Sequence, residues 1–178
     1  MAGSLANAWK SGSFFATVRL RAATRWDSQL IERAALLVTS DPDGDPSVID
    51  PSLDPHRARY FVKWWRNGDF GVVAEERGVF IGAAWCRRFD RGELEHPAMT
   101  PGAHEVAVAV EAERRRSGVG AVLVSSVLDA AAQHQLVGLE LTVGAHRDWL
   151  VRFYERAGFR VFALSGRHVL MRAPLGAE

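Results

Sequence analysis

The sequence predicts a single α/β domain (in the broad sense that includes α+β), and three observations support this. The chain has 178 residues, the length of one ordinary domain, and 48% of them are hydrophobic, which suffices for a packed core. Runs with the period of strands and of helices follow in the order β-α-α-β-β-β-α-β-α-β-β. No internal repeat, linker or low-complexity segment interrupts them. We therefore expect a loose tail over 1–12 and one domain over 13–178.

The N-terminal third holds one predicted strand and two predicted helices. Residues 14–20 are rich in β-branched and aromatic side chains, which favour a strand. Residues 26–38 carry apolar side chains at helical spacing, and 56–65 is a second helix candidate. The segment between them, 40–55, is dense in Pro, Asp and Gly and predicts a loop.

The central segment predicts a hairpin, a long loop and a strand. Residues 70–89 consist of two apolar runs that flank "EERG", the pattern of a β-hairpin. Residues 90–103 show no periodicity, and long loops in compact domains often serve function. Residues 104–111 alternate as a strand does. Its two predicted faces are Val106, Val108 and Val110 on one side and Glu105, Ala107, Ala109 and Glu111 on the other.

The C-terminal part predicts a helix over 117–135, a strand over 139–143 and a short amphipathic helix over 147–158. The last of these ends at Gly158, a natural C-terminal cap. The two remaining apolar runs, 159–164 and 168–173, flank "SGR" and predict a final hairpin.

Composition excludes several classes of function. The net charge is +1 and aromatic residues do not alternate with the arginine run, so nothing indicates a nucleic-acid partner. The apolar runs are too short to span a membrane, and residues 1–15 lack the apolar core of a signal peptide. Cys86 is the single cysteine, which fits a reducing cytoplasm and a role in packing. Metal binding is not expected, because the candidate ligands lack a common spacing: His104, His134, His146 and His168.

The stretch "RRRSGVGAV" combines positive charge with bare backbone at the start of a helix. Gly118 and Gly120 let another group approach the backbone, and the first N–H groups of a helix have no internal acceptor. Together they predict an anion site suited to phosphate. A P-loop would need Gly-Lys-Ser/Thr, but Ala121 and Val122 follow Gly120. A dinucleotide fingerprint would need a third glycine, which "GVGAVL" lacks.

Two motifs in this order resemble those of the GCN5-related N-acetyltransferases. "RRSGVG" (115–120) matches the R/Q-x-x-G-x-G/A signature of that family, and "FYERAGF" (153–159) is similar to its aromatic-Tyr-Glu motif. The hairpin over 70–89 also resembles strands 2 and 3 of the family. The resemblance covers about residues 14–173 and is strongest over 104–160. Arg-rich, Lys-poor composition is in addition typical of a GC-rich bacterial genome.

The resemblance implies a fold, a co-substrate and a set of contacts. The fold would be a mixed sheet splayed between strands 4 and 5 and flanked by about four helices. Acetyl-CoA would lie in that opening, with its pantetheine on the backbone of strand 4, its pyrophosphate on the glycine turn, and no metal. Where the family often has Asn, this chain has Arg147. The implied contacts are Val108, Ala109, Val110, Arg115, Arg116, Ser117, Gly118, Val119, Gly120, Ala121 and Arg147.

The resemblance also implies direct transfer of the acetyl group to an amine. Tyr154 occupies the position of the general acid, because a phenol keeps its proton at neutral pH and can give it to the leaving sulfur. Glu105 is the candidate base, acting through a water, and an amide of strand 4 such as that of Val108 would hold the oxyanion. The alternative interpretations are that Tyr154 only packs in the core and that Glu105 is a solvated strand-end charge. His104 is predicted to face the other way.

The acceptor is not encoded in any motif. Small molecules and protein amines are both compatible, as is a homodimer, and residues 40–57 and 90–103 are expected to line the acceptor cleft. Asp90, Glu93 and Glu95 either attract a cationic amine there or are solvated. The competing hypothesis is a domain that binds acyl-CoA without catalysis, as a sensor or an interaction module.

Overall fold

The computed structural model describes residues 18–39, 58–94 and 96–175. The predicted tail (1–12), the predicted loop over 40–55 and the first residues of the predicted strand over 14–20 lie outside them. The strands are β1 (Val18–Ala22), β2 (Phe70–Glu76), β3 (Val79–Arg88), β4 (His104–Val110), β5 (Gly138–Gly144), β6 (Arg160–Ser165) and β7 (His168–Pro174). The helices are α1 (Ser28–Thr39), α3 (Val119–Gln133) and α4 (Asp148–Arg156), with 3-10 turns at Arg25–Asp27, Arg91–Glu93 and Ala112–Arg114.

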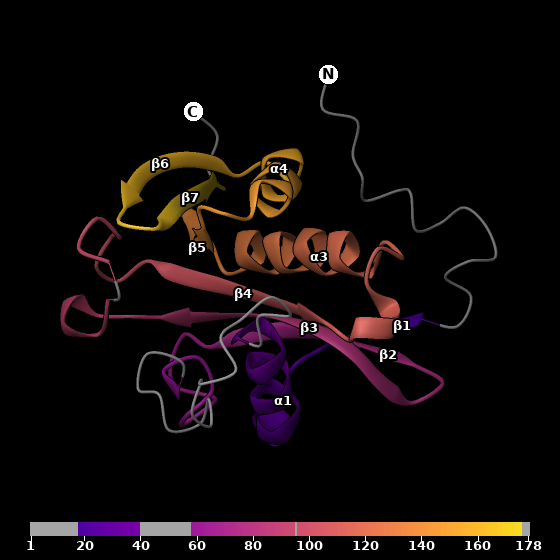
Figure 1. The fold of residues 1–178 in the computed structure, drawn as a ribbon. Coiled ribbons are helices and arrows are strands. Elements are labelled where there is room, and N and C mark those ends of the chain that lie inside the picture. The colour runs from indigo at the N-terminus through magenta and orange to yellow at the C-terminus, as the bar shows by residue number, and fades with distance from the viewer. Residues whose placement is uncertain (1–17, 40–57, 95, 176–178) are drawn as a thin grey trace.

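The seven strands form one mixed sheet in the order β1-β2-β3-β4-β5-β7-β6. Every neighbouring pair is antiparallel except β4 and β5, which are parallel. That pair is in register at only two positions, His104 with Leu139 and Glu105 with Glu140. Beyond Glu105 the two strands part, as Figure 1 shows. The predicted splay between strands 4 and 5 is therefore confirmed.

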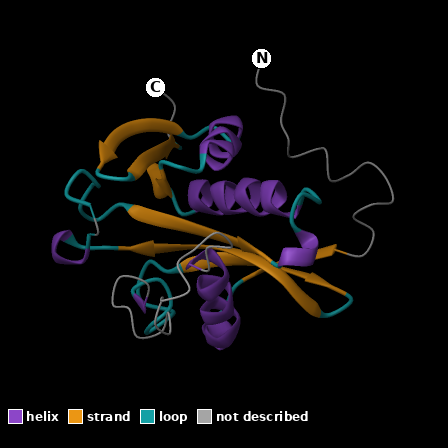
Figure 2. Ribbon diagram, in the orientation of Figure 1, coloured by secondary structure: helices purple, strands orange, loops and turns teal. Residues whose placement is uncertain are grey.

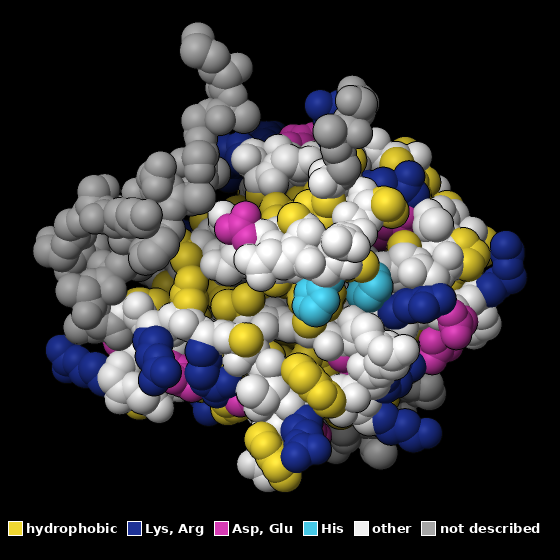
Figure 3. All heavy atoms as spheres, turned by 180° about the vertical axis from the view of Figure 1, so that it is seen from behind, with side chains coloured by type: hydrophobic (Ala, Val, Ile, Leu, Met, Phe, Trp, Pro, Cys, Tyr) yellow, Lys and Arg dark blue, Asp and Glu magenta, His cyan; other side chains and the backbone are white. Residues whose placement is uncertain are grey.

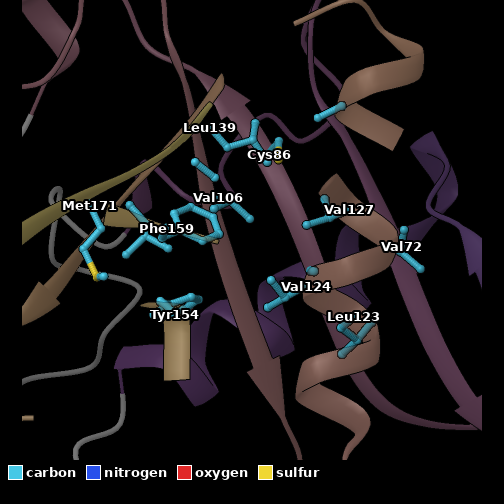
Figure 4. Close-up of a cluster of buried hydrophobic side chains, with 14 of the residues drawn as sticks. Val72, Cys86, Val106, Leu123, Val124, Val127, Leu139, Tyr154, Phe159 and Met171 are labelled. Atoms are coloured by element: carbon cyan, nitrogen blue, oxygen red, sulfur yellow. The ribbon is translucent and has the colours of Figure 1, made fainter. Parts of the chain in front are cut away.

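Helices cover both faces of the sheet (Figures 1 and 2). On one face α3 and α4 pack on a large apolar cluster that includes Val106, Leu123 and Tyr154 (Figure 4). On the other face α1 packs on a second cluster that includes Ala107 and Ala109. Alternate residues of β4 thus belong to different cores, as its two-residue period predicts. About four helices were expected, and the described residues contain three.

The hairpins follow their turn chemistry. β2 and β3 are joined by Arg77 and Gly78, both with positive φ (51° and 79°), which is the two-residue turn that suits the twist of a hairpin. The final hairpin of β6 and β7 is also present. Both predicted hairpins are confirmed.

The predicted helix over 56–65 is shorter than expected where it is described. The Val62 amide donates to the Ala58 carbonyl (2.8 Å), but Lys63 and Trp65 have positive φ (54° and 77°), which ends any helix at Lys63. Trp64 is buried and Trp65 is exposed, so of these two adjacent tryptophans only Trp64 belongs to the core. Among the described residues, none of the helices has the length and apolar character needed to cross a bilayer.

Candidate active site

The gap between β4 and β5 exposes one edge of β4. The Glu111 amide donates to the Ile81 carbonyl (3.0 Å), and Val110 is the register partner of Gly82. Because antiparallel strands alternate the direction of their hydrogen bonds, Ala109 bonds toward β3. A Cβ on Gly82 would lie 2.6 Å from the Ala109 carbonyl oxygen, which agrees with that direction.

By the same alternation, Val106, Val108 and Val110 point their N–H and C=O groups into the gap. Arg115 donates to the Val110 carbonyl, while the N–H and C=O of Val108 lie on the stretch of this edge that β5 does not cover, which suits pairing with an extended molecule. Of the three residues expected to contact pantetheine, Val108 and Val110 lie on this edge. Ala109 differs, because its backbone groups face β3.

The glycine turn stands where β4 runs into α3. Arg116 and Gly118 both have positive φ (59° and 87°), and Gly118 caps the helix without a side chain. The first bond inside the helix runs from the Val122 amide to the Gly118 carbonyl (3.1 Å). The N–H groups of Val119, Gly120 and Ala121 therefore have no acceptor within α3. This geometry is suited to an anion.

Gly120 faces the mouth of the gap. A Cβ built on it would lie 3.6 Å from Cγ2 of Val110, on β4, and 3.7 Å from Cζ of Phe153, on α4. Both are ordinary van der Waals contacts, so the fold tolerates a side chain at this position. Any longer side chain would extend between β4 and α4.

The three consecutive arginines have different surroundings. Arg114 forms an ion pair with Glu76 of β2. Arg115 donates from Nε to the Val110 carbonyl (3.2 Å), whereas Arg116 is exposed. Ser117 donates from Oγ to the Arg114 carbonyl (2.5 Å) and so fixes the turn. Arg115 and Arg116 remain positioned near the glycine turn, while Arg114 anchors it to the sheet.

Tyr154 lies on α4 in the cluster under α3. It is 7% exposed and makes edge-to-face contacts with Phe153 (5.1 Å between centroids) and Phe159 (5.5 Å). Burial raises the pKa of its hydroxyl above the usual value, so the phenol keeps its proton at all physiological pH values. The packing expected for this residue is present, and it is compatible with a proton donor.

Arg147 lies at the N-terminal end of α4, where the chain leaves β5. Its backbone amide donates to the Gly144 carbonyl (2.9 Å) and its Nε contacts Nε2 of His146 (3.3 Å). Arg147 follows β5, and the glycine turn follows β4, so both come after the ends of the two diverging strands.

Glu105 lies on the face of β4 opposite to Tyr154. Its side chain is 3% exposed, forms an ion pair with Arg59, and accepts a hydrogen bond from the Tyr60 hydroxyl (2.5 Å to Oε1). Its neighbours on the same face of β4, Ala107 and Ala109, pack against the second core. Arg59 and Tyr60 fill the space at Glu105. The carboxylate is therefore buried and compensated rather than solvated.

Arg87 was missed by sequence reasoning. It is fully buried on β3, where it is the register partner of Glu105, and it pairs with Asp69 (Nη2 to Oδ2, 3.2 Å). It also donates to three carbonyls at the end of the turn over 58–63, those of Arg59, Val62 and Lys63. Burial lowers its pKa, and Asp69 opposes that shift. An arginine inside "WCRRF" at an inward strand position was the available signal.

A second buried carboxylate lies beside Glu105. Glu140, its register partner on β5, accepts from Nε of Arg172 (2.9 Å) and from the Thr100 amide (3.0 Å). These bonds hold the loop between β3 and β4 against the sheet. Within the same loop, Nδ1 of His96 lies 3.2 Å from Oγ of Ser165 at the end of β6. The part of 90–103 that is described is thus docked over β5 and β7.

Figure 3 shows how charged and hydrophobic side chains are distributed on one face of the molecule. On the face drawn in Figure 3, Lys and Arg side chains lie around the rim together with Asp and Glu, and hydrophobic side chains occupy the middle. Within residues 18–39, 58–94 and 96–175, no three His, Cys, Asp or Glu side chains are grouped so that they could hold a metal ion.

Comparison with known proteins gives a consistent result. The chain matches the acetyltransferase (GNAT) family model over residues 38–159. It is 27% identical over 117 residues to a mycothiol acetyltransferase of Acidimicrobium ferrooxidans, a match that covers 65% of this chain and 36% of that protein. The chain therefore spans about a third of the length of this relative.

Solved structures share the fold. One of them is yncA of Salmonella typhimurium with its cofactor acetyl-CoA, at 22% identity and a TM-score of 0.63; the match covers 92% of this chain and 96% of that one. Another is the ribosomal-protein-alanine N-acetyltransferase of Brucella melitensis (18% identity, TM-score 0.63, 88% and 99%). A third is a GNAT-family acetyltransferase of Staphylococcus aureus (13% identity, TM-score 0.65, 89% and 99%).

Proposed function

The chain belongs to the acetyltransferase (GNAT) family, and we propose that it transfers the acetyl group of acetyl-CoA directly to a primary amine. The observation that carries the proposal is the coincidence of an open β4 edge with a glycine turn at its end. The β4 edge suits an extended chain and the glycine turn suits an anion. Acetyl-CoA contains both, an extended pantetheine and a diphosphate. The related structure with acetyl-CoA supports this choice of co-substrate.

The co-substrate contacts follow from the open groups. Pantetheine amides would pair with the backbone of Val108 and Val110, and the diphosphate would accept from the amides of Val119 to Ala121. Charge-assisted hydrogen bonds of this kind are about twice as strong as neutral ones. Arg115 and Arg116 would add positive charge, and Arg147 would act at the start of α4. Acetyl-CoA supplies the thioester that the amine attacks.

The chemistry assigns one proton to each of two residues. Glu105, through a water, takes a proton from the acceptor ammonium, so that the nitrogen lone pair attacks the thioester carbonyl carbon. The N–H of Val108 stabilises the oxyanion. As the C–S bond breaks, the sulfur takes the proton of Tyr154, and the second proton of the nitrogen, released as the amide forms, restores the phenol. Burial raises the pKa of that phenol, so Tyr154 still carries its proton at neutral pH when the C–S bond breaks.

The acceptor is proposed as an amine of a small molecule or of a protein. Both kinds occur in the names of related proteins, a mycothiol acetyltransferase and a ribosomal-protein-alanine N-acetyltransferase. We propose no nucleic-acid or membrane partner and a cytoplasmic location, on the composition and the single cysteine. A single domain over 13–178 remains part of the proposal.

One observation favours a second function. Both carboxylate oxygens of Glu105 already accept hydrogen bonds, from Arg59 and Tyr60. A domain that binds acyl-CoA without transferring the acyl group would need no base there. Release of CoA in the presence of amines, measured with a thiol reagent, separates the two functions, because a sensor binds acetyl-CoA without turnover.

Calorimetric titration with acetyl-CoA, CoA and NADH tests the site itself. We expect the first two to bind and NADH not to bind. Gly120→Glu should abolish binding, because it adds a carboxylate between β4 and α4, although Glu in the first turn of a helix is favourable for folding. Gly92→Glu adds the same charge where nothing lies within 4 Å and should bind normally. Equal affinity of both variants would contradict the assignment of the glycine turn.

A further inference from the structure

The buried position of the proposed base raises the question of how a proton reaches it. Glu105 is 3% exposed, so an acceptor ammonium in the cleft does not contact it directly. Two donors stand on its oxygens, the guanidinium of Arg59 and the hydroxyl of Tyr60. A proton that arrives at Glu105 has to pass one of them or displace it.

The two donors differ in chemistry. Arginine has five donors, no acceptor, and a pKa too high for it to lose a proton in a protein. A tyrosine hydroxyl both donates and accepts. While the Tyr60 proton points at Oε1 of Glu105 (2.5 Å), the lone pairs of its oxygen are directed elsewhere. Tyr60 is half-buried whereas Glu105 is 3% exposed, so the tyrosine is the more accessible of the two residues.

Tyr60 is held firmly in this position. Its backbone carbonyl accepts from the indole N–H of Trp85 (2.9 Å), and its ring meets that of Phe89 edge to face (6.1 Å). The Arg59 guanidinium lies over the Tyr60 ring (5.1 Å) and the Phe89 ring (4.0 Å). A rotamer fixed by packing keeps the hydroxyl at hydrogen-bond distance from Glu105.

We propose that Tyr60, in place of a water, relays the acceptor proton to Glu105, an inference that rests on the proposed acetyl transfer. The ammonium of the acceptor gives one proton to the Tyr60 oxygen as the Tyr60 proton moves to Oε1 of Glu105. The products are a neutral amine, an unchanged phenol and a protonated Glu105. Glu105 precedes Val106, where β4 and β5 part, so the relay ends beside the open strand edge.

Arg59 favours the ionised form of Glu105, so its charge opposes the transfer until the proton has moved. Arg59 compensates Glu105, while the neighbours on either strand form closed pairs, Arg87 with Asp69 and Glu140 with Arg172. When Glu105 takes the proton, the charge of Arg59 is no longer compensated. A positive charge nearby disfavours an ammonium and favours the neutral amine. The amine is thereby kept in its nucleophilic form.

The test compares amines that need a base with amines that do not. Tyr60→Phe removes only the hydroxyl, since ring packing and the backbone bond to Trp85 remain. Wild type and variant are assayed for CoA release with n-propylamine, spermidine and alanine amide, which are protonated at neutral pH, and with methoxyamine, which is neutral. We expect kcat/KM to fall about 100-fold for the protonated amines, the usual size of a general-base effect. The rate with methoxyamine should hardly change.

Two further variants sharpen the result. Glu105→Gln should show the same selective loss, and combining it with Tyr60→Phe should add nothing, because the two residues act as one unit. Thr142→Val removes a hydroxyl that contacts Sδ of Met99 (3.8 Å) and should leave both kinds of amine unaffected. The melting temperature of each variant reports on folding separately.

The outcomes distinguish the proton relay from the acetyl transfer on which it rests. An equal loss with all amines, or no loss, overturns the relay while the transferase stands. If the wild type binds acetyl-CoA but acetylates none of the amines, the proposed transfer fails and the relay with it. Selective loss with the protonated amines supports both.

Discussion

The ion pair between Asp69 and Arg87 should contribute far more to stability than the pair between Asp90 and Arg88. The first pair is inside the protein, with side chains 0% and 1% exposed, and the second is on the surface at 3.9 Å, with side chains 80% and 54% exposed. Removing one partner of a buried pair costs about 3–5 kcal/mol, because the other charge stays buried without compensation. An exposed pair contributes about 0–1 kcal/mol.

Asp69→Asn keeps the shape of the side chain and removes its charge. The backbone amides of Trp65 and Arg66 also donate to Oδ2 of Asp69 (3.1 and 2.9 Å), so the amide has to satisfy them and Arg87 with a single oxygen. The three carbonyls that Arg87 contacts retain part of its hydrogen bonding, which places the expected loss near the lower limit, about 3 kcal/mol. With a urea m-value of about 2 kcal/mol/M, the midpoint moves by about 1.5 M.

Urea unfolding followed by tryptophan fluorescence measures this loss. Asp90→Asn is the matched control, since it makes the same chemical change in the same part of the chain and should move the midpoint by less than about 0.5 M. Midpoints of the two variants that agree within error would refute the reasoning, because burial would then not decide the value of the pair.

Three other predictions follow from single contacts. Gly82→Ala should destabilise the protein by about 1–3 kcal/mol in the same urea assay, because its Cβ would lie 2.6 Å from the Ala109 carbonyl, whereas Gly92→Ala should be neutral; the reverse order would contradict the tight packing of β3 on β4. Tyr154→Phe should lower kcat about 100-fold or more with little change in acetyl-CoA affinity by calorimetry, and equal turnover would remove the acid role. Burial lowers the pKa of His104 from 6.5, so the unfolded state binds more protons and stability should fall as pH drops below 6.5. His104→Gln should reduce that slope in unfolding measured against pH, and an unchanged slope would assign it to other groups.

Local signals in the sequence were sufficient for the elements and for the geometry of the glycine turn. The alternation of 104–111, the glycines at 118 and 120 and the turn at "EERG" each act over a few residues, so their structural consequences are readable in order along the chain. The length of the helix predicted over 56–65 was overestimated, because the prediction used only such local signals. Its apolar pattern continues to Trp65, but the backbone takes a positive φ at Lys63. Arg87, from a distant strand, donates to three carbonyls of this turn, including that of Lys63.

The sequence by itself determined the α/β class, the order of strands and helices, and the motifs that indicate the family. The tertiary structure decided which charges are buried together. Glu105 reads as a strand-end charge in the sequence, yet its partners Arg59 and Tyr60 lie about 45 residues away along the chain. Pairing of this kind depends on long-range packing, because a buried carboxylate is stable only where the fold brings donors to it. No local pattern carries that information, and the surroundings of Glu105 are built from such pairs.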